Sequence, residues 1–287
     1  MQMRNEKAVW SGLLLSFILW MPSCSGPRLA QIMTYEEYHQ LSVRPPYVIE
    51  LRGKKGSLLY FGAAHSVDPN HSQVAQMIHR WDEFRPTVAY SEGGISPLKE
   101  TVEEAVRNEG ETGLLRYFAE RDKVPIRSLE PTDSSEVEML LSHFTAEQVK
   151  LHYLLRQVMQ FRREGRVEPL EAYLGRYLTE FNAIVALDVP PYTVTEIKEC
   201  VRRVLPLLED WTRVPETWFY PTRSEAFTNE IARRLNRFRD EHMVELLTHA
   251  VMNGERVYAV VGHSHVVMQE PALRTILDQP RLERKNQ

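Results

Sequence analysis

Five short apolar runs, separated by longer helix-like segments, constrain the fold more than any other feature of this sequence. Each run is rich in β-branched and aromatic residues and lies next to glycine, proline or charged residues, which is typical of strands. The predicted strands are Tyr47–Leu51, Ser57–Gly62, Pro86–Ser91, Pro125–Leu129 and Arg256–Val261. Strands that alternate with helices favour an α/β fold with a largely parallel central sheet and helices on both faces. A hairpin-like turn at Gly53-Lys54-Lys55-Gly56 makes the expected sheet mixed.

Apolar residues at helical spacing predict the segments between these strands. Near the strands, the expected helices are Asn70–Asp82, Pro97–Arg107, Gly113–Arg121 and Val266–Asp278. No convincing strand falls between residues 133 and 252, where the helix-like segments are Ser134–His143, Ala146–Glu164, Leu170–Ile184, Val194–Leu208 and Ser224–Asn253. We therefore expect one α/β domain over residues 44–287, with a long all-helical insertion at about 133–252.

The N-terminus has the pattern of an export signal. Arg4 and Lys7 precede an apolar run from Ala8 to Met21, which is shorter than the ~20 residues that span a bilayer. Cys24 follows it in a short stretch that resembles a bacterial lipoprotein cleavage site. This pattern predicts a signal peptide over residues 1–23 and a linker over residues 24–43. The mature protein would be exported and held to the membrane by a lipid on Cys24, facing the periplasm or the exterior. A plain secretory signal, with a periplasmic or secreted product, is the alternative.

Charge and cysteine content exclude several classes of function. The 35 basic and 39 acidic residues give a formal net charge of -4, so the chain lacks the basic excess that grips nucleic acid. Its cysteines, Cys24 and Cys200, supply neither a disulfide framework nor a cysteine-based zinc site. We therefore expect no nucleic-acid partner; the peptide or small ester substrate that we expect rests on the motifs described below.

Titratable side chains follow four of the predicted strands at or just past their ends. They are His65, Glu92, Glu130 and His265. The carboxyl ends of parallel strands open into one crevice, and ligands bind there in open α/β sheets. The sequence therefore predicts that two imidazoles and two carboxylates converge at one edge of the sheet.

The two histidines also share a local pattern. Gly62-Ala63-Ala64-His65 and Gly262-His263-Ser264-His265 are both G-x-x-H sequences directly after an apolar strand. Glycine permits a sharp turn out of the sheet, and small residues keep the floor of a crevice open. The repeated pattern supports a shared site for His65 and His265.

The paired G-x-x-H sequences, with Glu92 ending a strand between them, resemble those of the TraB/GumN/Tiki group of proteins. That group belongs to a wider superfamily with erythromycin esterases and ChaN-like haem-associated lipoproteins. Arg239-Asp240 is similar to an Arg-Asn or Arg-Asp pair that these families carry on the helix before the last motif. The resemblance covers about Leu58 to Leu277. It implies a hydrolase fold and, in the Tiki branch, a metal-dependent protease.

Carried over by motif, His65, Glu92, His265 and Arg239 are the expected catalytic residues. Position at the strand ends makes His65, Glu92, Glu130 and His265 the candidate ligands of a divalent metal such as manganese, cobalt or zinc. Such a metal would activate a water molecule for hydrolysis. Without a metal, one histidine would act as a general base on water, and the other histidine or Arg239 would stabilise the oxyanion. The sequence leaves both chemistries open.

The function expected from these features is hydrolysis of a peptide or ester bond at a His/Glu site by an exported protein. Two alternatives belong to other classes. One is a ChaN-like lipoprotein that binds haem or a metal without turnover. The other is a non-catalytic scaffold that retains the fold.

Overall fold

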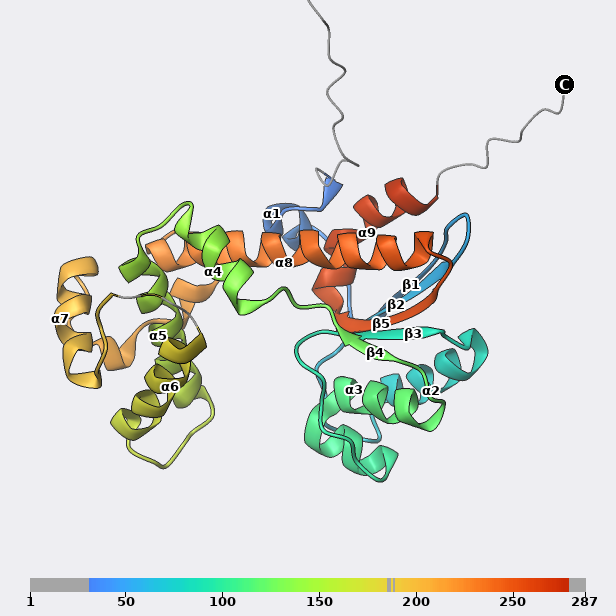
Figure 1. The fold of residues 1–287 in the computed structure, drawn as a ribbon, viewed down its shortest axis with the longest axis horizontal. Coiled ribbons are helices and arrows are strands. Elements are labelled where there is room, and N and C mark those ends of the chain that lie inside the picture. Colours follow the sequence, from blue (N-terminus) through green and yellow to red (C-terminus); the bar gives the residue numbers. More distant parts are fainter. Residues whose placement is uncertain (1–30, 185–186, 188, 279–287) are drawn as a thin grey trace, which may run out of the picture.

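The computed structural model describes residues 31–184, 187 and 189–278, and within them five short strands form one sheet (Figure 1). The strands are β1 (Tyr47–Arg52), β2 (Ser57–Ala63), β3 (Val88–Ser91), β4 (Ile126–Ser128) and β5 (Arg256–Gly262). Their order in the sheet is β1-β2-β5-β3-β4. β1 pairs antiparallel with β2, and the other pairs are parallel. The predicted α/β class with a largely parallel mixed sheet is confirmed.

Strand register brings the two G-x-x-H sequences together. β2 and β5 are neighbours in the sheet, and their pairing sets Gly62 beside Val261 and Ala63 beside Gly262. Both strands are buried on both faces, which is characteristic of central parallel strands. The two motifs therefore leave the sheet side by side at its carboxyl edge, although they are far apart in the chain.

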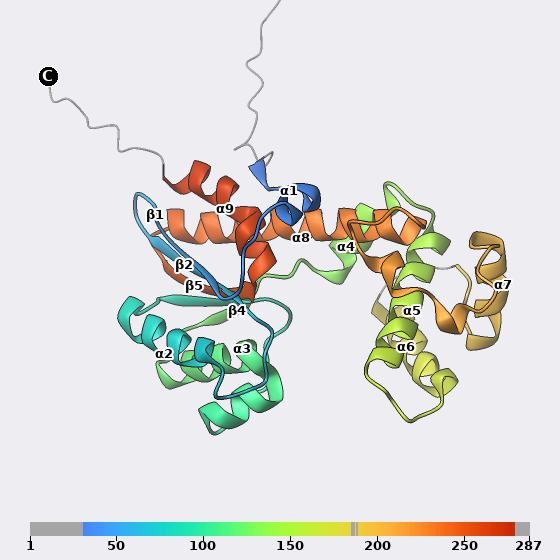
Figure 2. The ribbon, with the colours of Figure 1, turned by 180° about the vertical axis from the view of Figure 1, so that it is seen from behind.

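Helices cover both faces of the sheet (Figures 1 and 2). On one face α2 (Ser72–Phe84) and α3 (Val102–Arg121) pack Met77, Trp81 and Phe118 against alternate side chains of β2 and β5. On the other face lie α1 (Tyr35–His39), α9 (His263–Leu277) and the second half of α8 (Phe227–Met252). Side chains alternate between the two faces of a strand, so successive residues of β2 and β5 lie in two separate cores.

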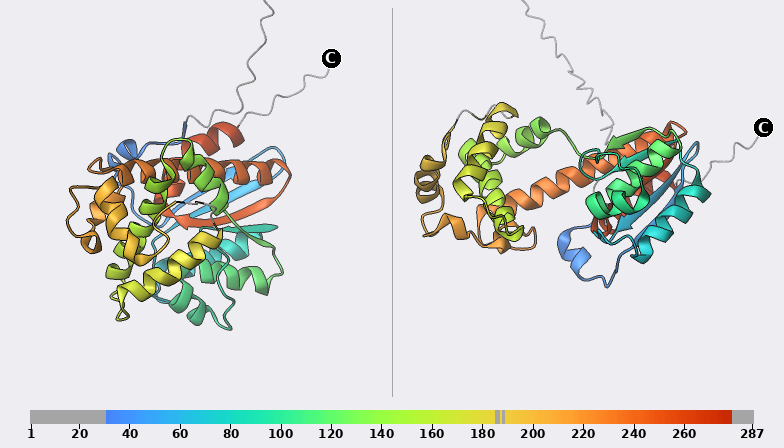
Figure 3. Two further views of the ribbon diagram at one scale, coloured as in Figure 1. Left: turned by 60° about the vertical axis from the view of Figure 1, so that its left-hand side comes forward. Right: turned by 90° about the horizontal axis from the view of Figure 1, so that it is seen from below.

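The remaining helices form a second lobe, joined to the sheet by α8 (Figures 1 and 3). They are α4 (Asp133–Leu141), α5 (Ala146–Arg163), α6 (Leu170–Ile184) and α7 (Val194–Val204), followed by two 3-10 turns, Trp211–Arg213 and Glu216–Phe219. Early in α8, Ile231 and Leu235 pack within this lobe. Later in α8, Met243 and Leu247 pack against the sheet. The lobe therefore ends within α8, before the expected boundary at 252, because one continuous helix serves both cores.

The segment expected to be a linker contributes to the domain. Ile32 is buried in the core, and the backbone N–H of Met33 donates to the carbonyl of Met268 at 2.9 Å. The Tyr38 hydroxyl lies 2.9 Å from His263 Nε2. Residues 32–39 thus pack on α9 because they carry apolar side chains that the sheet domain buries.

The predicted signal peptide and Cys24 lie outside the described residues. Within the described part of the chain, no helix combines the length and the apolar character needed to cross a membrane.

Gly110 interrupts α3 at the point where the sequence predicted a gap between two helices. Its φ of 62° and ψ of -142° belong to a conformation that only glycine reaches readily. The helix resumes at once with Glu111, a buried carboxylate. A Cβ on Gly110 would also lie 3.3 Å from the carbonyl oxygen of Ser66, in the loop after β2. The kink therefore lets α3 approach that loop closely.

We expect Gly110→Ala to lower the free energy of unfolding by ~1–3 kcal/mol, because alanine is strained in this conformation. Gly175→Ala is the matched control. Gly175 lies inside α6 with no atom within 4 Å of an added Cβ, so alanine there should stabilise the protein by ~0.5–1 kcal/mol. Denaturant unfolding of both variants measures the difference. Equal effects of the two substitutions would contradict the role given to the kink.

Candidate active site

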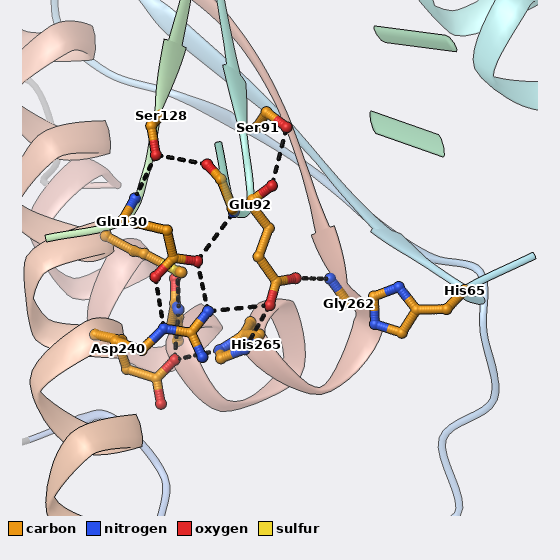
Figure 4. Close-up of polar contacts among 12 residues, drawn as sticks. His65, Ser91, Glu92, Ser128, Glu130, Asp240, Gly262 and His265 are labelled. Atoms are coloured by element: carbon orange, nitrogen blue, oxygen red, sulfur yellow. Dashed lines mark hydrogen bonds and ion pairs between the residues drawn. The ribbon is translucent and has the colours of Figure 1, made fainter. Parts of the chain in front are cut away.

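The carboxyl edge of the sheet carries a network of charged side chains from several separate elements (Figure 4). His65 follows β2, Glu92 follows β3, and Glu130 follows β4. His265 lies in the first turn of α9, directly after β5. Arg239 reaches the same edge from α8, where its guanidinium contacts Glu92 and Glu130. The structure thus brings the expected catalytic residues to one edge, where Glu92 lies between the two histidines.

Glu92 links the two ends of this network. One carboxylate oxygen accepts the backbone N–H of Gly262 at 2.6 Å. The other lies 3.2 Å from Arg239 Nη2 and 3.4 Å from His265 Nε2. Burial alone would raise the pKa of Glu92, but the contacts with His265, Gly262 and Arg239 outweigh burial and hold the pKa well below its usual range. Glu92 is therefore ionised at neutral pH.

Arg239 and Glu130 form a two-pronged ion pair. Arg239 Nε donates to one oxygen of Glu130 at 2.6 Å, and Nη2 donates to the other at 2.5 Å. Glu130 also accepts the backbone N–H of Gly93 at 3.0 Å. Burial opposes the charge of Arg239, but Glu130 and Glu92 more than compensate and raise the pKa of Arg239. Paired hydrogen bonds of this kind fix the orientation of the guanidinium.

His265 is enclosed and charged. Its side chain is 9% exposed, and its Nδ1 lies 2.6 Å from Asp240 Oδ1. Burial alone would lower the pKa of His265, but Asp240 and Glu92 outweigh burial and raise the pKa to about 10. Asp240 is itself held by Gln269, whose Nε2 donates to Oδ1 at 2.7 Å. At neutral pH His265 is therefore an imidazolium between two carboxylates and cannot accept a proton.

His65 has the opposite environment. Its side chain is 71% exposed, and its Nδ1 lies 2.6 Å from Oε1 of the buried Glu111. The hydrogen bond with Glu111 raises the pKa of His65, while partial burial acts in the other direction. The ring points toward the backbone of Gly262 (Figure 4). A Cβ on Gly262 would lie 2.9 Å from His65 Nε2. The glycine of the second motif therefore makes room for the histidine of the first.

A cleft of about 460 Å³ opens beside His65. Its wall includes Glu92, Glu111, Glu130 and Arg239. His65 is therefore an accessible base in this cleft, with the fixed positive charge of Arg239 in the same wall.

Three of the expected metal ligands, Glu92, Glu130 and His265, are engaged in ion pairs as they are arranged. Arg239 bridges Glu92 and Glu130, so its guanidinium takes the place that a cation would need between the two carboxylates. His265 Nε2 faces Glu92 at 3.4 Å and belongs to the same ion-pair network. Among residues 31–184, 187 and 189–278, no three histidine, cysteine, aspartate or glutamate side chains are placed so that they could share a metal ion. His65, Glu92, Glu130 and His265 thus fit an ion-pair network better than a coordination sphere.

Sequence reasoning missed Glu111, Gln269 and the site role of Asp240. Asp240 had a signal, because it forms a pair with Arg239 in the motif on α8. Glu111 had none: it is distant from His65 in the chain and lies in a stretch with many carboxylates. The kink at Gly110 and the packing of α3 on the sheet bring it to His65.

Comparison with protein-family models, with curated proteins and with solved structures finds no match to this chain. The resemblance to the TraB/GumN/Tiki group therefore rests on the motifs alone and stays a prediction.

The charged state of His265 predicts a pH-dependent contribution to stability. The pKa of this histidine is 6.5 in an unfolded chain and about 10 in the fold. The stabilisation that its charge gives is therefore complete below pH 6.5 and is lost as pH rises toward 10. We expect His265→Gln to lower the thermal midpoint most at about pH 6 and least at about pH 10. His79→Gln should show a much smaller trend, because His79 is 78% exposed and its ion pair with Glu83 at 3.8 Å lies in solvent. A loss for His265→Gln that is constant over this range would mean that His265 is neutral.

Proposed function

We propose that this protein hydrolyses an ester or peptide bond by activating a water molecule with His65. The observation that carries the proposal is the pairing of an exposed imidazole with a buried carboxylate at the wall of a cleft. A base needs access to the reacting water and a partner that fixes its orientation, and His65 has both. His265 has carboxylate partners, but its ring is enclosed and a reacting water has no access to it.

Glu111 sets the protonation pattern of the base. When Nδ1–H of His65 donates to Glu111, the lone pair remains on Nε2, the nitrogen near Gly262. Nε2 can then take a proton from water as that water attacks a carbonyl carbon. Glu111 stabilises the imidazolium that results, as the carboxylate does in other carboxylate–histidine pairs. His65 can return the proton to the leaving group when the carbon–oxygen or carbon–nitrogen bond breaks.

Arg239 supplies positive charge for the tetrahedral intermediate. Its side chain is 20% exposed, lines the cleft and is held in place by Glu130 and Glu92. A pre-oriented cation next to the developing oxyanion stabilises the transition state without reorganisation. Glu92 and His265 serve this arrangement as positioning residues, because Glu92 touches Arg239, His265 and the backbone of Gly262.

We propose that the protein acts outside the cytoplasm. The N-terminal pattern supports export, with a lipid on Cys24 as the membrane attachment and a released periplasmic or secreted form as the alternative. The expected substrate is a peptide or small ester outside the cytoplasm.

The direct test is a screen of model esters and peptides with the wild type, with His65→Ala and with His79→Ala. Loss of a positioned base should lower kcat/KM by about 10²–10⁴-fold, while His79→Ala should match the wild type. Each assay is repeated after EDTA treatment, which should leave activity intact. Loss of activity with EDTA and its return with manganese or zinc would support the metal-dependent chemistry instead. A haem absorbance band without turnover would support the ChaN-like alternative.

The pH dependence of the reaction tests the role of Glu111. Activity requires neutral His65, so kcat/KM should rise with pH through the pKa of His65. Glu111 raises that pKa, so Glu111→Gln should lower it and move the rising limb of the profile to lower pH. The same variant should also lower the plateau rate, because the ring loses its charged partner. A limb that stays in place would show that Glu111 does not act on the base.

A further inference from the structure

We infer that the substrate carries an uncharged, apolar acyl chain or side chain next to the scissile bond, and that Val67, Ile95 and Leu98 receive it. This inference rests on the proposed hydrolase function and names its substrate class. We call these three residues the apolar rim.

The apolar rim consists of large hydrophobic side chains that the fold leaves in solvent. The exposed fractions are 61% for Val67, 45% for Ile95 and 49% for Leu98. Single exposed apolar residues are ordinary, but a group next to a polar site is typical of ligand contact. Val67 comes two residues after His65, and Ile95 comes three residues after Glu92. The rim therefore belongs to the two loops that carry site residues.

Contacts with α3 hold the loop after β3 at the cleft. The Ser96 hydroxyl lies 2.8 Å from that of Thr112, and Lys99 Nζ lies 3.4 Å from Glu109. Thr112 and Glu109 both line the cleft that contains His65. Ser96 and Lys99 lie on either side of Leu98 in the chain, and Ile95 directly precedes Ser96. Figure 1 shows this segment between β3 and α3, on the side of α3 that faces the helical lobe.

The loop after β2 reaches the same part of α3. Val67 lines the cleft, and the carbonyl of its neighbour Ser66 lies against Gly110. Gly110 is flanked in the chain by Glu109 and by Glu111, the partner of His65. Both loops therefore meet at the kink of α3, beside the proposed base.

Charge in the cleft disfavours an anionic substrate. Four carboxylates line it, and they belong to Glu92, Glu109, Glu111 and Glu130. The two basic groups among the described lining residues, His65 and Arg239, are already engaged by carboxylates. A negatively charged substituent would meet repulsion from these carboxylates and would compete with the oxyanion for Arg239, the cation of the wall that the proposed reaction uses. An uncharged apolar group can contact the apolar rim without this electrostatic repulsion.

The test measures kcat/KM for p-nitrophenyl acetate, butyrate and hexanoate and for the anionic succinate half-ester, using the full-length protein. Each methylene that leaves water favours binding by about fourfold. Because the rim is partly exposed, we expect a gain of at least about tenfold from acetate to hexanoate. The succinate half-ester should be at least about tenfold poorer than butyrate, which has the same length of acyl chain without the charge.

A triple variant, Val67→Ser with Ile95→Ser and Leu98→Ser, should reduce the hexanoate-to-acetate ratio toward one. Leu207→Ser is the matched control, since Leu207 is 93% exposed and lies in the helical lobe. It should keep the wild-type ratio. An unchanged ratio in the triple variant, or a preference for the succinate half-ester, would overturn the inference while leaving the hydrolase proposal in place.

Binding of N-methylhexanamide, measured by calorimetry, tests the rim without turnover. We expect the wild type to bind this amide more tightly than the triple variant does. If no ester is cleaved but this difference is found, the proposed reaction fails and the apolar binding site stands. If the triple substitution changes only the oligomeric state or the association with phosphatidylcholine vesicles, the rim serves a second copy or a membrane, and the inference is wrong.

Discussion

The contact of Arg239 with Glu130 and Glu92 is the interaction on which the rest of the site depends. It joins α8 to the ends of β3 and β4, and α8 is also the helix that connects the two lobes. Removing one partner of a largely buried ion pair leaves a charge without compensation, which costs more than the pair itself contributes. The same contact holds Glu92 where it can reach His265 and Gly262. The same contact therefore neutralises the buried charges of Arg239, Glu130 and Glu92 and fixes the geometry of the site.

Two histidines in equivalent motifs have different chemistry because their surroundings differ. His265 lies between Asp240 and Glu92, so the positive form is favoured and the ring is closed to substrate. His65 has one carboxylate partner, on one nitrogen, and stands in solvent at the cleft. A single sheet edge thus supplies an accessible base and a fixed charge, a division of roles that environment alone can impose on one residue type.

Much of the fold was predictable because its strands are short, apolar and well separated. All five predicted strands form, with shifts of one or two residues at their ends. The position of His65, Glu92, Glu130 and His265 at the carboxyl edge follows from parallel pairing, which the alternation of strands and helices already favoured. Residues 32–39 were expected in a linker and the second half of α8 in the helical insertion, because local patterns do not tell which core an amphipathic segment will join.

The sequence by itself determined the class of fold, the edge at which the site lies and the residue types that meet there. Hydrophobic periodicity and strand ends are local properties, so they are visible in the chain. Only the tertiary structure decided the protonation and pairing of those residues. Glu111 reaches His65 through a kink at Gly110, and Arg239 enters between two carboxylates from the helix that connects the two lobes. Such contacts depend on the packing of distant segments and on burial, which set pKa values and leave no pattern in the sequence.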